Sequence, residues 1–181
     1  YAYDPDEINN NAYIELSREI SDNIILGKNS TINIPAGIIV NNSLKNEKVY
    51  PKVFIEGKEF DASKENLYKF ENLGSVKIEY LYNSPELNNV TKTINVEIKD
   101  IPAIDAQNIN SVYSRGSIIE LPELKAIKDD KTFIPDLKIY TPADNIIENN
   151  FKAETVGTYK AEYKYNFGES EYIYEQCFEV I

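Results

Sequence analysis

The chain has 181 residues with a hydrophobic share of 42%, which is enough for packed cores. Thirty acidic side chains against nineteen basic ones give a net charge of −11, so nucleic acid and anionic membrane surfaces are not expected as partners. The absence of histidine excludes imidazole bases, His-containing catalytic triads and His-containing zinc sites. No segment approaches the ~20 apolar residues of a membrane helix, so no membrane insertion of this segment is expected.

Residues 1–23 form a lead-in that the pattern predicts to be helical. Asp4, Pro5 and Glu7 have the spacing of a helix start, with a capping residue, a first-turn proline and an acidic third position. Apolar residues then recur every four positions, at Ile8, Ala12, Leu16 and Ile20. We therefore predict a short amphipathic helix over residues 5–20. An extended lead-in is the alternative, because the asparagines at 9–11 are poor helix formers and residues 12–17 also alternate.

An internal repeat is the strongest feature of the rest of the chain. The stretch "LGSVKIEYLYN" at residues 73–83 returns as "VGTYKAEYKYN" at residues 156–166. Further pairs keep the same order along the chain: Gly74 with Gly157, Tyr80 with Tyr163, Pro35 with Pro122, and Pro51 with Pro135. Small loop insertions and deletions account for the slight drift in spacing. The repeat predicts two homologous domains, residues 24–100 and 101–181.

Both repeats have the period of β-strands. Val76, Ile78, Tyr80 and Tyr82 alternate with Lys77, Glu79 and Leu81, and their counterparts in the second copy alternate with charged residues. Pro35 and Pro122 would interrupt a central strand, so we expect each at an edge or at a kink where a strand passes between sheets. Short strands separated by turn residues predict an all-β fold with one sandwich in each copy.

The junction between the copies is short. Only Lys99 and Asp100 lie between the last alternating strand of the first copy and Ile101, and Pro102 stiffens the segment. We therefore expect the two copies to lie end to end as an elongated rod, with a modest polar interface.

The second copy resembles the bacterial immunoglobulin-like (Ig-like) domains that recur in tandem on surface proteins of Gram-positive bacteria and Bacteroidetes. Gly157 and Tyr159 match the glycine and tyrosine that open the long alternating strand in that family. The acidic turn is matched by Asp129 and Asp130, and the polar turn by Phe167 and Gly168. The first copy matches the family pattern less closely, since Val76 replaces the tyrosine. The resemblance implies two tandem Ig-like β-sandwiches in an exported, extracellular bacterial surface protein.

Several residues could carry chemistry, and each has a simpler structural explanation. Tyrosines could stack on sugars, but Tyr80, Tyr82, Tyr163 and Tyr165 lie on the apolar faces of their strands and are expected in the core. The acidic groups at 4–7, 128–130, Asp100 and Asp105 lack the spacing of a calcium loop. A Lys–Asn crosslink has no identifiable residue pair, a Gln176–Cys177 thioester is not implied by adjacency, and no spacing supports a two-carboxylate glycosidase. We predict no catalytic, cofactor-binding or metal-binding residues and no cofactor.

These observations predict a protein that is not an enzyme. The expected function is a structural or adhesive spacer of an exported bacterial surface protein, acting as a monomer at the cell surface. The alternative is a ligand-binding module for a host or cell-surface protein or glycan. An exposed aromatic patch outside the two cores would favour that alternative, because a spacer does not need one. Strand alternation also predicts that Cys177 is partly accessible, since Phe178 and Val180 are expected to face the core.

Overall fold

The structure is a computed structural model that describes residues 12–41 and 47–181. These residues form an all-β fold without helices. The helix predicted over residues 5–20 is therefore wrong from residue 12 onward, where Tyr13–Leu16 form strand β1; residues 1–11 lie outside the described part. In β1 the side chain of Ile14 is buried while its neighbours Tyr13 and Glu15 are exposed. The extended structure that was the alternative for this segment is therefore present here. Its two-residue alternation prevailed over the four-residue spacing that predicted a helix.

The first half of the chain contains nine strands among its described residues. They are β1, β2 (Asn23–Gly27), β3 (Ser30–Ile34), β4 (Gly37–Val40), β5 (Lys52–Ile55), β6 (Lys58–Asp61), β7 (Asn66–Phe70), β8 (Gly74–Ser84) and β9 (Asn88–Lys99). Five of them make a sheet in the order β2-β9-β8-β5-β6, in which β2 runs parallel to β9. The pairs β1-β4 and β3-β7 make two further antiparallel ladders. This arrangement is of the β-sandwich class.

The second half contains ten strands. They are β10 (Ala103–Ile104), β11 (Val112–Tyr113), β12 (Ile118–Ile119), β13 (Ala126–Lys128), β14 (Lys131–Phe133), β15 (Asp136–Tyr140), β16 (Ile146–Ile147), β17 (Phe151–Lys152), β18 (Gly157–Phe167) and β19 (Ser170–Val180). The five-stranded sheet has the order β11-β19-β18-β15-β16, and β11 runs parallel to β19. With β14 set aside, each strand pairing of the first half has a counterpart here, in the same chain order and direction.

The residues that repeat in sequence occupy equivalent places. Gly74 begins β8 and Gly157 begins β18, with φ of 124° and 136°, a region in which a glycine has no steric penalty. The hydroxyl of Tyr80 donates to the carbonyl oxygen of Pro35 at 2.6 Å. Likewise, the hydroxyl of Tyr163 donates to the carbonyl oxygen of Pro122 at 2.8 Å. The repeated tyrosine and the repeated proline are thus bonded to each other in both halves.

Both prolines lie where an extended run of chain changes its partner strand. Pro35 separates β3, which pairs with β7, from β4, which pairs with β1. Pro122 separates β12, which pairs with β17, from β13, which pairs with β10. The predicted kink is therefore confirmed. Its physical reason is that a proline has no N–H to leave unpaired where the chain passes from one ladder to the next.

The two halves meet at the segment from Ile101 to Ile109, which we call the junction segment. Ile104, Ala106 and Ile109 from this segment belong to one continuous cluster of buried apolar side chains that also includes residues of both halves. The junction segment does not leave the first half directly. It runs beside β3, where the amide of Ala106 donates to the carbonyl oxygen of Thr31 at 2.9 Å.

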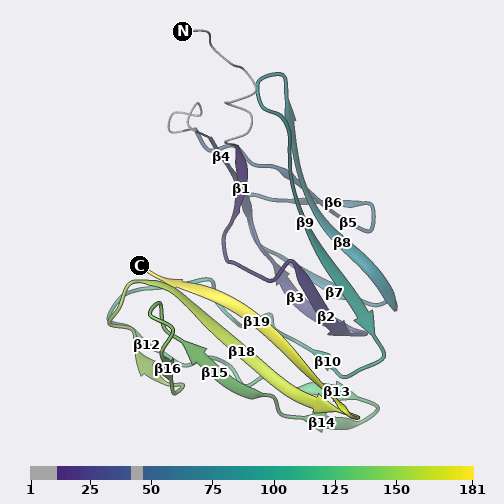
Figure 1. Cartoon of the computed structure of the whole chain (residues 1–181), viewed down its shortest axis with the longest axis vertical. Helices are drawn as coiled ribbons and strands as arrows, with labels where there is room; N and C mark the ends of the chain where they lie inside the picture. The colour runs from purple at the N-terminus through teal and green to yellow at the C-terminus, as the bar shows by residue number, and fades with distance from the viewer. Residues whose placement is uncertain (1–11, 42–46) are drawn as a thin grey trace.

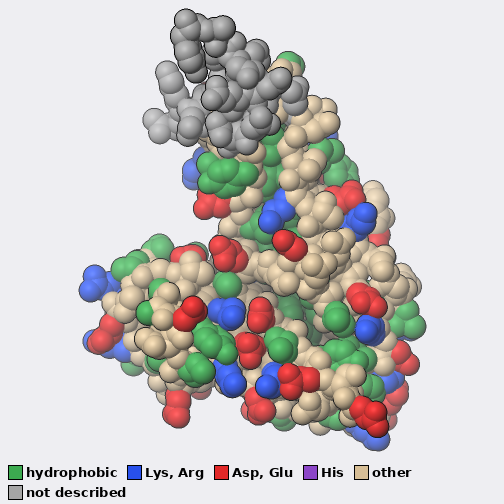
Figure 2. Space-filling view, viewed as in Figure 1, with side chains coloured by type: hydrophobic (Ala, Val, Ile, Leu, Met, Phe, Trp, Pro, Cys, Tyr) green, Lys and Arg blue, Asp and Glu red, His purple; other side chains and the backbone are tan. Residues whose placement is uncertain are grey.

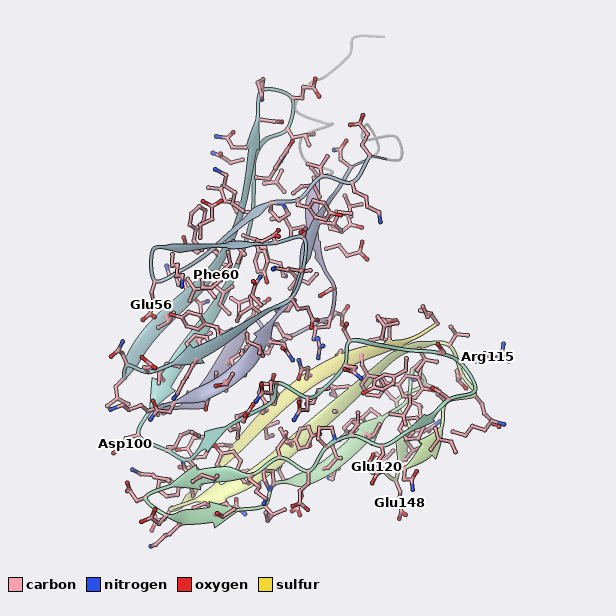
Figure 3. The ribbon with its side chains drawn as sticks, turned by 180° about the vertical axis from the view of Figure 1, so that it is seen from behind. Glu56, Phe60, Asp100, Arg115, Glu120 and Glu148 are labelled. Atoms are coloured by element: carbon pink, nitrogen blue, oxygen red, sulfur yellow. The ribbon has the colours of Figure 1, made fainter. Side chains whose placement is uncertain are left out.

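The overall shape is a V, not the rod expected from the short linker (Figure 1). Seen from behind, Asp100 lies near the closed end of the V and Arg115 lies at the far end of the second half (Figure 3). The rod was predicted from the shortness of the linker alone, without the contacts that the following residues make with the first half. Ile104, Ala106 and Gln107 of the junction segment are hydrogen-bonded to β3, and this contact turns the second half back toward β1.

Candidate functional site

Polar contacts fix the junction segment to β3. The amide of Ile104 donates to the side-chain oxygen of Ser30 at 3.0 Å. The side-chain amide of Asn33, which is only 8% exposed, donates to the carbonyl oxygens of Ala106 and Gln107 at 3.4 and 3.1 Å. Because these bonds are largely shielded from water, they fix the position of the junction segment on the first half.

Gly27, the last residue of β2, allows the backbone of the junction segment to lie very close to β2. A Cβ atom at this position would lie 2.2 Å from the carbonyl oxygen of Pro102 and 2.3 Å from that of Ile101. Both obstacles are backbone atoms, which cannot turn aside as a side chain can. Gly27 is therefore required by space, not by an unusual backbone angle.

Arg18 links three segments at the same interface. Arg18 is 2% exposed as a residue, and its Nε and Nη2 donate to the two carboxylate oxygens of Glu65 at 2.9 and 3.1 Å. Nη2 also donates to the carbonyl oxygen of Ile109 at 2.9 Å. A forked pair of this kind gives the buried Nε and Nη2 good partners, whereas Nη1 is buried without a hydrogen-bond partner. Arg18 thus joins the turn after β1, the loop before β7 and the junction segment.

A cleft of about 980 Å³ lies between the two halves. One wall is the outer face of β1 and β4 with the neighbouring residues Lys48 and Tyr50, and the other wall includes Thr158 and Glu179 from the second half. Figure 2 shows the molecule hollowed between its upper and lower parts on the side of β1. The cleft exists because the V brings β18 and β19 opposite the first half.

The exposed aromatic rings of the described residues gather in this cleft. Tyr13 is 55% exposed and Tyr50 is 42% exposed, and both line it. Every other phenylalanine and tyrosine in the described part of the chain is buried or half-buried. Sequence reasoning missed this site because its walls come from segments far apart in the chain. The available signal was Tyr13 itself, which lies on the outward side of the "AYIELS" alternation.

A second groove, of about 1030 Å³, crosses the outer face of the first five-stranded sheet. Its lining mixes charged and amide side chains with apolar ones, and the half-buried Phe54 is its aromatic ring. The corresponding face of the second half carries ion pairs between neighbouring strands, Lys160–Glu175 at 3.8 Å and Lys164–Glu171 at 3.6 Å. The first-half groove has neither an exposed ring nor a converging set of ligands.

The tyrosines that sequence analysis assigned to the core lie there. Tyr80, Tyr163 and Tyr165 are buried and Tyr82 is half-buried. Burial raises the pKa of Tyr165 to about 12, because the phenolate would lose its hydration. These rings are therefore unavailable as a surface for stacking.

The acidic residues considered for calcium do not converge. Asp129 and Asp130 form the β13–β14 turn with φ of 49° and 65°. Lys128 pairs with Asp100 at 2.7 Å and with Asp129 at 3.3 Å, and the hydrogen bond from Lys128 lowers the pKa of Asp100. Within the described ranges no group of three potential metal ligands occurs. The acidic residues at 4–7 lie outside those ranges.

Cys177 is partly accessible, as strand alternation predicted. Its amide donates to the carbonyl oxygen of Glu19 at 3.3 Å, and burial raises the pKa of its thiol to about 11. Gln176 is fully buried, and its side-chain oxygen accepts a hydrogen bond from Tyr174 at 3.2 Å. Because neighbours in a strand face opposite sides, these two side chains point apart, as expected for a plain thiol.

Two comparisons with known proteins found no match for this chain. No family model matches the chain, and no curated protein matches it in sequence. In the part of the chain that the structure describes, no helix has the length and apolar character needed to cross a membrane.

Proposed function

We propose that the chain is a pair of tandem Ig-like β-sandwiches serving as a non-catalytic structural or adhesive spacer in an exported bacterial surface protein. Two features support the tandem arrangement. The strand pairings of the halves correspond, and each half repeats the same tyrosine-to-proline hydrogen bond. Duplication of one module accounts for both features more simply than independent origin does.

The observation that carries the spacer function is the fixed junction. A spacer must hold its two ends at a defined distance and angle, and a freely hinged pair of modules cannot do so. Buried contacts at Gly27, Asn33 and Arg18 hold the second half against the first. The net charge of −11 further supports a monomer, because copies of the chain repel one another.

The spacer function is tested by measuring the distance between the halves. Spin labels are placed at exposed positions 59 and 148 of the full chain, through Glu59→Cys and Glu148→Cys with Cys177→Ser as background. Pulsed dipolar spectroscopy then gives the distribution of distances. A rigid spacer predicts a single narrow distribution, as narrow as that of a control pair within the second half, Glu120→Cys with Lys131→Cys. A distribution much broader than the control's would contradict the proposal.

The second candidate function is a ligand-binding module for a glycan or a protein. One observation favours it: the exposed aromatic rings of the described residues, Tyr13 and Tyr50, both lie in the cleft between the halves. Exposed aromatic rings in a cleft are typical of binding sites, since burying them in a complex is favourable.

A further inference from the structure

We propose that the cleft between the two halves binds a neutral saccharide chain, with Tyr13 and Tyr50 as stacking surfaces. This inference deepens the ligand-binding function and is independent of the spacer function. The cleft volume of about 980 Å³ lies at the upper end of the range typical for small-molecule sites, and a few sugar units fit within it.

The aromatic wall supplies the apolar part of the site. Tyr13 lies in β1 opposite Val40 of β4, on the side of this two-stranded sheet facing away from the core. The amide of Ile39 in β4 donates to the carbonyl oxygen of Val49 at 2.8 Å, which brings the chain before Tyr50 alongside β4. Both rings are therefore held on strands or directly beside them. A tyrosine in such a place offers a flat apolar face to a sugar ring, together with a hydroxyl group for hydrogen bonding.

The opposite wall and the rim supply hydrogen-bonding groups. The hydroxyl of Thr158 donates to the carboxylate of Glu179, so these two side chains hold each other in position. The ammonium group of Lys92 lies 3.6 Å from Asp22. Donors and acceptors that are already positioned suit the vicinal hydroxyls of a sugar, because little side-chain ordering remains to be done on binding.

The charge of the cleft indicates a neutral ligand. Its charged lining consists of three carboxylates and three cations, namely Glu15, Glu19 and Glu179 with Arg18, Lys48 and Lys92. Arg18 is already committed to Glu65. With Arg18 set aside, three carboxylates remain against two cations, so the cleft carries little net charge within a molecule of net charge −11 and does not attract a polyanion.

The test uses the full chain and a panel of neutral tetrasaccharides built from glucose, galactose or N-acetylglucosamine. Saturation-transfer NMR detects binding, and titration gives the affinity. At least one tetrasaccharide is expected to bind. Tyr13→Ala and Tyr50→Ala should each weaken that binding about tenfold through loss of stacking. Thr158→Val should also weaken it, because the opposite wall takes part. Leu73→Ala, at a residue 56% exposed outside the cleft, is the matched control and should leave the affinity unchanged.

Three results would overturn the proposal. The first is no binding of any tetrasaccharide at millimolar concentration. The second is binding that Tyr13→Ala and Tyr50→Ala leave unchanged while circular dichroism shows both variants folded. The third is preferred binding of a sulfated tetrasaccharide, or of a protein that competes for the cleft. None of these results changes the distance distribution between the halves, so the spacer function stands or falls separately.

Discussion

Tyr80 and Tyr163 each complete a kink in the chain that a proline begins. The carbonyl oxygen of a proline at a change of partner strand needs a donor from outside the ladder, and the tyrosine hydroxyl provides it. The recurrence of this pair at equivalent places gives the repeated residues a shared physical role. Tyrosine is kept there for its hydroxyl as well as for its ring.

Removing either hydroxyl should lower stability. We expect Tyr80→Phe and Tyr163→Phe each to reduce the free energy of unfolding by about 0.5–1.5 kcal/mol, because a carbonyl that is buried at Pro35 and part-buried at Pro122 loses its partner. Urea denaturation measures the change. Tyr82→Phe is the matched control on the same strand as Tyr80 and should be close to neutral. Equal effects at Tyr80 and Tyr82 would contradict the role assigned to the hydrogen bond.

Gly27 should tolerate no larger residue. A methyl group there overlaps the Pro102 carbonyl, so Gly27→Ala is expected to cost about 1–3 kcal/mol and to loosen the junction. Thermal unfolding and the spin-label distance distribution measure the two effects. Ser114→Ala, at the corresponding position of the second half, is the control and should be nearly silent. A Gly27→Ala protein with unchanged stability and an unchanged distance would show that the contact is not tight.

The buried tyrosines make the protein sensitive to alkali. Burial raises the pKa of Tyr165 to about 12 from an unfolded value near 10, so the folded state favours the neutral phenol. Its stabilising contribution is complete below pH 10 and is lost as the pH rises from 10 toward 12. Urea midpoints measured between pH 8 and 12 should therefore fall only above pH 10. Tyr165→Phe should make that fall shallower, and an unchanged fall would contradict the assignment.

At the scale of elements, periodicity predicted the long strands and failed for the short ones. The alternating runs that became β8 and β18 were predicted directly, because one face of each packs on a core. Strands of two residues such as β11, β12 and β16 are too short for a period of two to appear. Their positions depend on pairing with distant strands, which the local sequence does not encode.

The lead-in shows how two local patterns compete. Ile8, Ala12, Leu16 and Ile20 fit a helix, whereas residues 12–17 also fit a strand. In the described part the strand prevailed because β1 pairs along its whole length with β4 and buries Ile14 beneath it. A helix in this segment would not form the hydrogen-bonded ladder with β4. Tertiary pairing decided the outcome, as it often does for short segments.

The cleft could not be predicted from sequence for the same reason. Its residues come from β1, β4, the approach to β5, β9 and the β18–β19 hairpin, and only the fold brings them together. The prediction that no catalytic or metal-binding residue occurs stays a prediction. The prediction of core tyrosines was confirmed at Tyr80, Tyr163 and Tyr165, because outward and inward positions of a strand are readable from alternation.

At the scale of the whole molecule, the V depends on a buried ion pair. We expect Arg18→Ala to destabilise the protein by about 1–3 kcal/mol, because the partly exposed Glu65 would lose its partner and the buried Ile109 carbonyl its donor. Urea denaturation measures the loss. The double variant Arg18→Ala with Glu65→Ala should recover part of it, since no unpaired carboxylate then remains. A double variant less stable than the single one would contradict this account.

The parallel pairing of β2 with β9, and of β11 with β19, has a mechanical consequence. A pull on the start of β2 and the end of β9, or on the start of β11 and the end of β19, draws the paired strands past each other along their length, so all the hydrogen bonds between them share the load at once. The first half is held by five residue pairs in register and the second by two. Under tension the second half should therefore yield first, while the first half still holds.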